Sequence, residues 1–334
     1  MRRVDRVRAA SGSLFGLAYG DALGKPTEFR TYAQIVREHG PGGPRQLPDP
    51  ALVTDDTQMA LAVAWALHDA VEPSPEELEP LLRERFLTWA KSPDNNRAPG
   101  MTCLTACANL FEGGPWQRAT VAGSKGCGAN MRVTPVGLIG SYDLDTLGGV
   151  AQLQAGMTHG HPTALAAAEL TALAVRLLRD GTPLADLPEV LRDHCADQRT
   201  DYRWDWLGDL WERPGATTPE DFAARGWDEC AAALETLIRH AGRRDDGGDV
   251  SVLTGEGWVA EEALATGLLA ALRHPDDPVA ALGRAAATNG DSDSIACLAG
   301  AFLGAAGGMA IWPAAWAERI EYADQLDLLG TAWD

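Results

Sequence analysis

Long runs of alanine and leucine constrain the fold of this chain more than any other feature, and residues 162–178 (PTALAAAELTALAVRLL) are the clearest example. Similar runs recur along the whole sequence and favour helices, whereas residues that favour strands are scarce. With 334 residues, 46% of them apolar, the chain can bury a substantial core. No fixed-period repeat or low-complexity tract divides it. We therefore predict an all-α chain that forms a single domain over residues 1–334.

Capping residues, apolar periodicity and Pro/Gly clusters set the expected helix boundaries. Long loops are expected at residues 91–100 and 112–132, and loops of this length in a compact domain are usually functional or mobile. Glycines stand at every fourth position from Gly12 to Gly24, so either a helix or a ligand could approach the backbone closely there. The predicted helices cover residues 52–68, 75–90, 102–110, 163–180, 184–197, 219–241, 256–273, 277–288 and 294–309.

The charge of the chain argues against nucleic acid as a general partner. Its formal net charge is −19, from 47 acidic and 28 basic residues, so it would repel a phosphate backbone and has no basic stripe for a duplex. One small anionic ligand stays compatible with this charge, because bound cations and helix N-termini can reverse the field inside a pocket.

Cysteine usage and hydropathy favour a cytoplasmic protein outside the membrane. The six cysteines stand singly, without CxxC pairs, which fits a reducing compartment. Residues 1–10 are basic and then turn apolar, but Gly20 and Asp21 interrupt the apolar region of the supposed signal peptide, so we expect no export. Residues 295–317 lack charge but consist mostly of alanine and glycine, which predicts a buried core helix rather than a membrane span.

Two acidic helix starts lie nearly the full chain length apart, VTDDT at residues 53–57 and GDSDS at residues 290–294. Each could be an ordinary N-cap, because Thr, Ser and Asp side chains accept orphan amide protons and carboxylates suit the helix dipole. Together they carry more oxygen acceptors than two helix starts need. Surplus carboxylates without nearby His or Cys favour a hard cation, Mg²⁺ or Mn²⁺. The sequence leaves open whether the two starts meet.

A glycine-rich turn at residues 126–132 (GCGANMR) precedes an apolar helix, and its amides could cradle a phosphate group. A loop that needs glycine only for its backbone conformation is the alternative. Residues 157–162 (MTHGHP) could likewise begin a helix with a core or capping histidine, or place His159 at a ligand.

Four separated motifs, GDALG at residues 20–24 with Glu28, TDDT at 54–57, GCGANMR at 126–132 and GDSDS at 290–294, together resemble the ADP-ribosylglycohydrolase family in order and spacing. The resemblance spans about residues 11–312. It implies an all-α bundle with a centre of two Mg²⁺ or Mn²⁺ ions, acting on ADP-ribose attached to a protein substrate. Residues 95–103 (NNRAPGMTC) and 157–163 (MTHGHPT) are most similar to the ADP-ribosylarginine hydrolases.

The resemblance also implies roles for individual residues. Glu28 would lie on a loop over the metals, Gly100 would border the reacting ribose, and His159 would contact a phosphate or the distal ribose. The diphosphate would lie on the loop formed by Gly126, Cys127, Gly128 and Ala129, with Met131 lining the pocket. The implied metal ligands are Thr54, Asp55, Asp56, Asp291, Asp293 and Ser294.

Cleavage at the anomeric carbon develops oxocarbenium character. We expect the cations to orient the ribose and favour ionisation of water, with Asp55 or Asp56 accepting the proton and Glu28 positioning substrate or closing the site. The alternatives are a hydrolase for another ADP-ribose linkage, to serine, a nucleic-acid end or an acetyl ester, and a catalytically silent relative that binds ADP-ribose. The sequence does not determine the oligomeric state.

Overall fold

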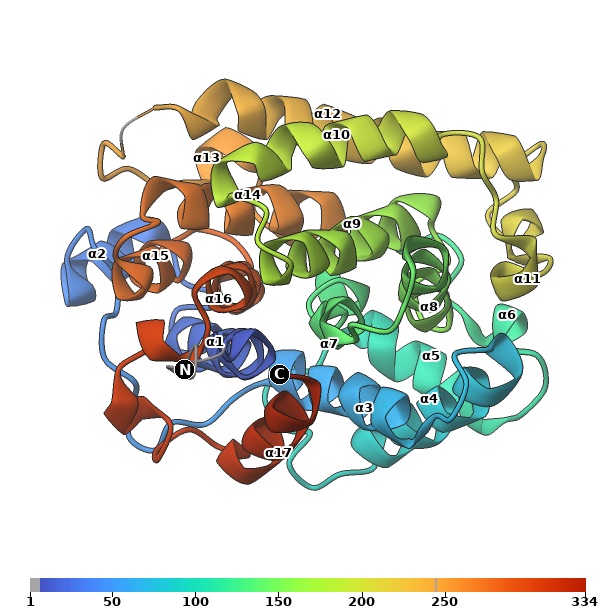
Figure 1. The fold of residues 1–334 in the computed structure, drawn as a ribbon, viewed down its shortest axis with the longest axis horizontal. Coiled ribbons are helices and arrows are strands. Elements are labelled where there is room, and N and C mark those ends of the chain that lie inside the picture. The colour runs from blue at the N-terminus through green and yellow to red at the C-terminus, as the bar shows by residue number, and fades with distance from the viewer. Residues whose placement is uncertain (1–6, 244) are drawn as a thin grey trace, which may run out of the picture.

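The computed structural model describes residues 7–243 and 245–334, and the secondary structure of these residues is helical (Figure 1). They form no β-sheet and make only isolated β-bridges, such as Val121 with His159 and Gly126 with Val259. The all-α prediction is confirmed. Residues 1–6 of the segment that resembles a signal peptide lie outside the described residues.

Most of the helices expected from the sequence form with small shifts at their ends. The helix expected from residue 52 begins at Asp55, because Thr54 caps it in an extended conformation. The expected helix 256–273 was too long: Gly255 and Gly257 have φ of +109° and +82°, so α14 begins at Ala260. These helices are α3 (Asp55–Asp69), α4 (Pro75–Ala90), α5 (Met101–Phe111), α9 (Pro162–Arg179), α10 (Leu187–Gln198), α12 (Pro219–Ala241), α14 (Ala260–Arg273), α15 (Pro278–Ala285) and α16 (Ser292–Gly307).

The apolar helix expected after the glycine-rich turn forms as α7, but the other helices were not assigned from the sequence. The expected loop 112–132 contains one short helix and a 3-10 turn at Cys127–Ala129, so that prediction was only partly right. The further helices are α1 (Ala9–Gly24), α2 (Tyr32–His39), α6 (Trp116–Ala119), α7 (Thr134–Leu138), α8 (Leu144–Gly156), α11 (Trp204–Leu207), α13 (Ser251–Thr254) and α17 (Ala323–Trp333).

Helices α1 and α16 pack backbone to backbone in the middle of the bundle (Figure 1). A Cβ atom on Gly16 would lie 2.3 Å from the carbonyl oxygen of Gly300, and one on Gly300 would lie 1.9 Å from the carbonyl oxygen of Gly16. The glycines at every fourth residue of α1 therefore allow close packing of this helix against α16. At the end of α1, a Cβ atom on Gly24 would lie 2.3 Å from Cα of Asp293. This contact brings the segment after α1 to the acidic start of α16.

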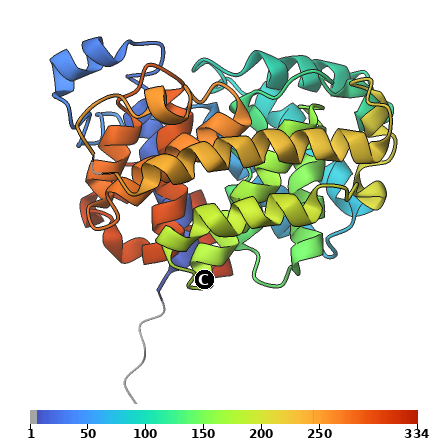
Figure 2. The same cartoon turned by 90° about the horizontal axis from the view of Figure 1, so that it is seen from above.

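The remaining helices form layers around this pair. Helices α10 and α12 lie side by side along one face, over α9 and α14, while α3 and α4 lie on the other side (Figures 1 and 2). Residues 295–305 of α16 are buried, as expected for a core helix. The core helix expected over residues 295–317 was too long, because α16 ends at Gly307 and Gly308 has φ of 71°. Among the described residues, no helix is long and apolar enough to cross a membrane.

Candidate metal centre and substrate cleft

The two acidic helix starts lie together. The Ser294 hydroxyl at the start of α16 donates a hydrogen bond of 2.8 Å to Oδ1 of Asp56 at the start of α3. On the same carboxylate, Oδ2 lies 3.2 Å from the hydroxyl oxygen of Thr54. The fold thus joins two segments that are more than two hundred residues apart through one buried carboxylate.

Asp21, which the sequence analysis gave no role in the site, holds the start of α3 in place. Its fully buried carboxylate accepts hydrogen bonds from the backbone amides of Thr54 and Thr57, at 2.9 and 3.0 Å. The hydroxyls of both threonines also donate to it, at 2.9 and 2.5 Å. The GDALG motif was the available signal, but the sequence could not show which segment Asp21 contacts.

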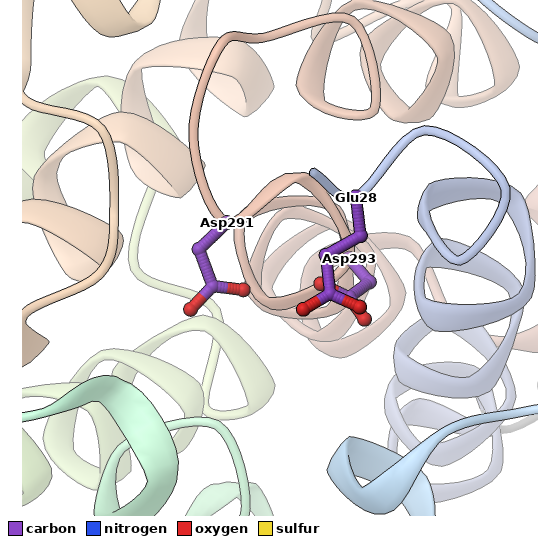
Figure 3. A group of neighbouring side chains, drawn as sticks. All are labelled: Glu28, Asp291 and Asp293. Carbon is purple, nitrogen blue, oxygen red and sulfur yellow. The ribbon is translucent and has the colours of Figure 1, made fainter. Parts of the chain in front are cut away.

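Glu28, Asp291 and Asp293 form a cluster in which each carboxylate offers an oxygen, all within 4.8 Å of one another. Figure 3 shows Glu28 on the segment after α1, facing the two aspartates at the start of α16. Asp291 is the N-cap residue of α16, yet its side chain makes no capping hydrogen bond. Capping therefore does not account for this carboxylate, and an all-oxygen donor set fits a hard divalent cation.

The carboxylates lie along a cleft of about 320 Å³. The backbone amide of Gly100 donates to Oδ2 of Asp55 at 3.1 Å, which attaches the loop before α5 to the start of α3. No lysine or arginine is among the described residues that line the cleft. The sequence-predicted residues that do line it are Glu28, Asp55, Asp56, Gly100, Gly126, Cys127, Gly128, Met131, His159, Asp291, Asp293 and Ser294.

Two predicted site residues, Thr54 and Ala129, do not line the cleft but support residues that do. Thr54 contacts Asp21 and Asp56, as described above. Ala129 is fully buried, and its carbonyl accepts a hydrogen bond of 3.0 Å from Gln154 Nε2. The expectation that Ala129 faces a diphosphate is therefore not matched by its position; only the three residues before it on the loop face the cleft.

The glycine-rich loop lies against the ring of His159. A Cβ atom on Gly128 would lie 3.1 Å from Cε1 of His159, and one on Gly126 would lie 3.4 Å from Nε2. A side chain at Gly128 would crowd the imidazole and would lie 2.8 Å from Sγ of Cys103, which accounts for this glycine. At Gly126 the added atom would be at an ordinary van der Waals distance. The loop and the histidine together form one wall of the cleft.

An aromatic pair at the cleft was missed from the sequence. Phe29 and Trp258 stack with ring centroids 5.7 Å apart and an interplanar angle of 20°. Both line the cleft, yet Phe29 is 68% exposed and Trp258 39% exposed. Phe29 has φ of 61°, a left-handed conformation that is unfavourable for a bulky residue. Both residues lie outside helices, so no periodic pattern could have identified them.

Burial and mutual repulsion perturb the acids of the cleft. Burial, followed by the charge of Asp291, raises the pKa of Glu28 to about 8. Burial also raises the pKa of Asp55 to about 7 and that of Asp291 to about 6. For Asp56 and Asp293, burial and then the neighbouring carboxylates raise the pKa well above its usual value. A divalent cation would favour the charged form of each group.

Comparison with known proteins agrees with this geometry. Residues 2–332 match the sequence profile of the family described as ADP-ribosylglycohydrolase. An ADP-ribosyl-[dinitrogen reductase] glycohydrolase from Rhodospirillum rubrum is 34% identical over 169 residues, covering 47% of this chain and only 53% of that protein. The ADP-ribosylhydrolase ARH3 of Homo sapiens is 28% identical over 349 residues, covering 95% of this chain and 90% of that protein.

A solved structure described as an ADP-ribosylglycohydrolase-related protein complex has the same fold. It superposes with a TM-score of 0.70 over 98% of both chains, at 24% sequence identity. The family profile covers nearly the whole sequence, including both acidic helix starts and the glycine-rich loop. The chain therefore belongs to the ADP-ribosylglycohydrolase family of hydrolases.

Proposed function

We propose that this protein hydrolyses the N-glycosidic bond between ADP-ribose and arginine in modified proteins, with two Mg²⁺ or Mn²⁺ ions as cofactors. The observation that carries the proposal is a cleft lined by five carboxylates and, among the described residues, by no lysine or arginine. We further propose that residues 1–334 form one domain that acts in the cytoplasm.

The residues present fit two hard cations. Carboxylates from two helix starts converge, and Glu28, Asp291 and Asp293 bring oxygens within 4.8 Å of one another. When bound, the cations would supply positive charge that neutralises the acids and polarises groups of substrate and water. The proposed ligands are Thr54, Asp55, Asp56, Asp291, Asp293 and Ser294.

The part of the cleft formed by the glycine-rich loop and His159 suits the ADP part of the substrate. The loop at Gly126, Cys127 and Gly128 lines the cleft beside a ring nitrogen of His159. The Cys127 amide already donates to the carbonyl of Trp258 at 3.1 Å, so a diphosphate would bind at the other amides of the loop. Met131 also lines the cleft. Gly100, hydrogen-bonded to Asp55, would border the reacting ribose.

The charge of the cleft favours a cationic leaving group. When ionised, the five carboxylates exceed the charge of two divalent cations by one negative charge. A guanidinium would offset this charge, whereas a serine hydroxyl would not. The faces of Phe29 and Trp258 at the cleft can also attract a cation. Both features support arginine over an oxygen linkage.

Within this site the side chains of the protein have separable tasks. Asp55 or Asp56 would accept a proton from the attacking water, because both carboxylates line the cleft. Glu28 would position the substrate or close the site, since it lies on the segment between α1 and α2 and faces Asp293. Stabilising the oxocarbenium character of the ribose would fall to the surrounding carboxylates.

The test is release of ADP-ribose from an ADP-ribosylarginine peptide and an ADP-ribosylserine peptide, with Mg²⁺, with Mn²⁺ and with EDTA. The enzyme is compared with an Asp55→Ala, Asp56→Ala double variant. A Glu76→Ala variant serves as the control, because Glu76 is an exposed acid in the first turn of another helix, α4.

Metal-dependent release from the arginine peptide, lost in the double variant and kept in the control, is the expected result. Faster release from the serine peptide would show that the preferred substrate has an oxygen linkage rather than the proposed linkage to arginine. A third outcome is that calorimetry detects binding of ADP-ribose but no ADP-ribose is released from either peptide, from nucleic-acid ends or from acetyl esters. That outcome would indicate a catalytically silent relative.

A further inference from the structure

Arg132 is a fully buried arginine that pairs with no carboxylate among the described residues. Its Nε donates to Oε1 of Gln154 at 2.7 Å, and Nη2 donates to the carbonyl of Gln154 at 2.6 Å. The guanidinium also lies over the ring of Phe86, 4.4 Å from its centroid. A cation kept in this apolar surrounding polarises any hydroxyl that it contacts.

The Thr158 hydroxyl is that contact. It accepts a hydrogen bond of 2.8 Å from Nη2 of Arg132, a group that can only donate. The same oxygen lies 2.8 Å from Nδ1 of His159 and 3.4 Å from the carbonyl of Ala155. Its single proton must go to one of these two acceptors. The shorter distance and the pull of the guanidinium both direct the proton to Nδ1 of His159.

The other ring nitrogen of His159 faces the cleft. Nε2 makes no hydrogen bond to any described residue, although the side chain is 1% exposed. It lies beside Gly126 and Gly128, where a Cβ atom would approach it to 3.4 Å in each case. A neutral imidazole that accepts a proton at Nδ1 must carry its own proton at Nε2.

We propose that Thr158 transmits the charge of Arg132 to His159 and thereby holds the histidine as the neutral tautomer with its proton on Nε2, which donates a hydrogen bond into the cleft. Thr158 and Arg132 are positioning residues in this arrangement. Burial and the nearby Arg132 also lower the pKa of His159 well below its usual value, so the ring stays neutral.

The tautomer decides what the wall of the cleft can bind. With the proton on Nε2, His159 places a donor beside the glycine-rich loop, and this part of the cleft suits an anion such as a diphosphate. With the proton on Nδ1, Nε2 would present a lone pair and repel the same anion. That this donor serves the diphosphate of ADP-ribose rests on the proposed function; the tautomer itself does not.

The tautomer is measured on the metal-loaded protein, labelled with ¹⁵N, by two-bond ¹H–¹⁵N correlation of the histidine rings at neutral pH. A His159→Gln variant assigns the ring. The expected spectrum has a protonated Nε2 and an unprotonated Nδ1 for His159. A Thr158→Val variant, which lacks the hydroxyl but keeps the shape, should lose this pattern, and Thr158→Ser should keep it.

Calorimetry with ADP-ribose provides the second readout. Thr158→Val should raise the dissociation constant about tenfold, the effect of losing one hydrogen bond to a charged group, and Thr158→Ser should restore it. A wild-type spectrum with the proton on Nδ1, or a doubly protonated ring, would overturn the proposal even if Thr158→Val did not fold. Failure to hydrolyse ADP-ribosylarginine would reject the proposed function and leave the spectrum to decide the tautomer.

Discussion

Asp21 has no ligand position in the proposed metal centre, yet its carboxylate accepts hydrogen bonds from both the amides and the hydroxyls of Thr54 and Thr57. These four donor groups belong to the residues at the start of α3, where Asp55 and Asp56 also lie. The orientation of two proposed ligands therefore depends on a residue on another helix.

We expect Asp21→Asn to destabilise the protein by about 2–4 kcal/mol and to weaken Mg²⁺ binding at least tenfold, because its amide group would oppose donors that now bond to a carboxylate. Urea unfolding and Mg²⁺ titration measure the two effects. Thr57→Val is the matched control: it removes only one of the four bonds, for about 1 kcal/mol. Unchanged Mg²⁺ affinity in Asp21→Asn would contradict the positioning role.

His161 gives a prediction about pH. Burial, followed by the charge of Arg225, lowers its pKa to about 4, and Nδ1 accepts the amide of Thr163, so protonation would break the cap of α9. The unfolded chain binds this proton first, near pH 6.5, and the folded protein resists it. The His161 contribution to stability is therefore lost as pH falls from about 6.5 to about 4.

His161→Asn tests this, because asparagine can cap a helix but does not titrate in that range. We expect the difference in unfolding free energy between wild type and variant to change by about 1–3 kcal/mol, in favour of the variant, between pH 6.5 and pH 4.5. A difference that stays constant over this range would show that His161 does not resist protonation in the folded protein.

At the scale of elements, the glycine contacts between α1 and α16 connect packing to the site. A Cβ atom on Gly12 would lie 2.3 Å from the backbone of Gly308, and one on Gly24 would lie 2.3 Å from Cα of Asp293. The two positions are equally crowded, but only the second adjoins a proposed metal ligand. Replacing each glycine therefore separates the effect on packing from the effect on the site.

We expect Gly12→Ala and Gly24→Ala each to destabilise the protein by about 1–3 kcal/mol, because backbone atoms cannot move aside for the added methyl group. Only Gly24→Ala should also weaken Mg²⁺ binding, by displacing Asp293. Gly42→Ala, at a position with open space around it, is the control for both measurements. Equal loss of Mg²⁺ affinity in Gly12→Ala and Gly24→Ala would mean that the contact at Gly24 does not position the ligand.

The helices that could be predicted from the sequence were those with capping residues and a regular apolar spacing of their own. Helix α4 forms at the expected residues because Ser74 caps it and Pro75 begins it. Helix α17 was missed, although its buried Leu326 and Leu329 have helical spacing. The roles of Asp21, Phe29 and Trp258 depend on contacts between distant segments, and a single sequence does not contain that information.

At the scale of the whole molecule, the acids of the cleft add to an already negative protein with a net charge of −19. Within the cluster, metal-free carboxylates with raised pKa values keep their protons longer than the unfolded chain does. The folded state then binds more protons than the unfolded state between about pH 4 and pH 8. Stability of the metal-free protein should therefore fall as pH rises through this range.

We expect Mg²⁺ to reverse this trend, because it binds the ionised cluster in the folded state and has no such site in the unfolded chain. In thermal unfolding, the EDTA-treated protein should lose a few kcal/mol of stability between pH 5 and pH 8, while saturating Mg²⁺ adds about 2.7 kcal/mol at one hundred times its dissociation constant. KCl at equal ionic strength is the control, since it screens the overall charge but cannot occupy the cluster. If KCl stabilised the protein at pH 8 as much as MgCl₂, the effect would come from screening, and the carboxylates at the two helix starts would not form a metal centre.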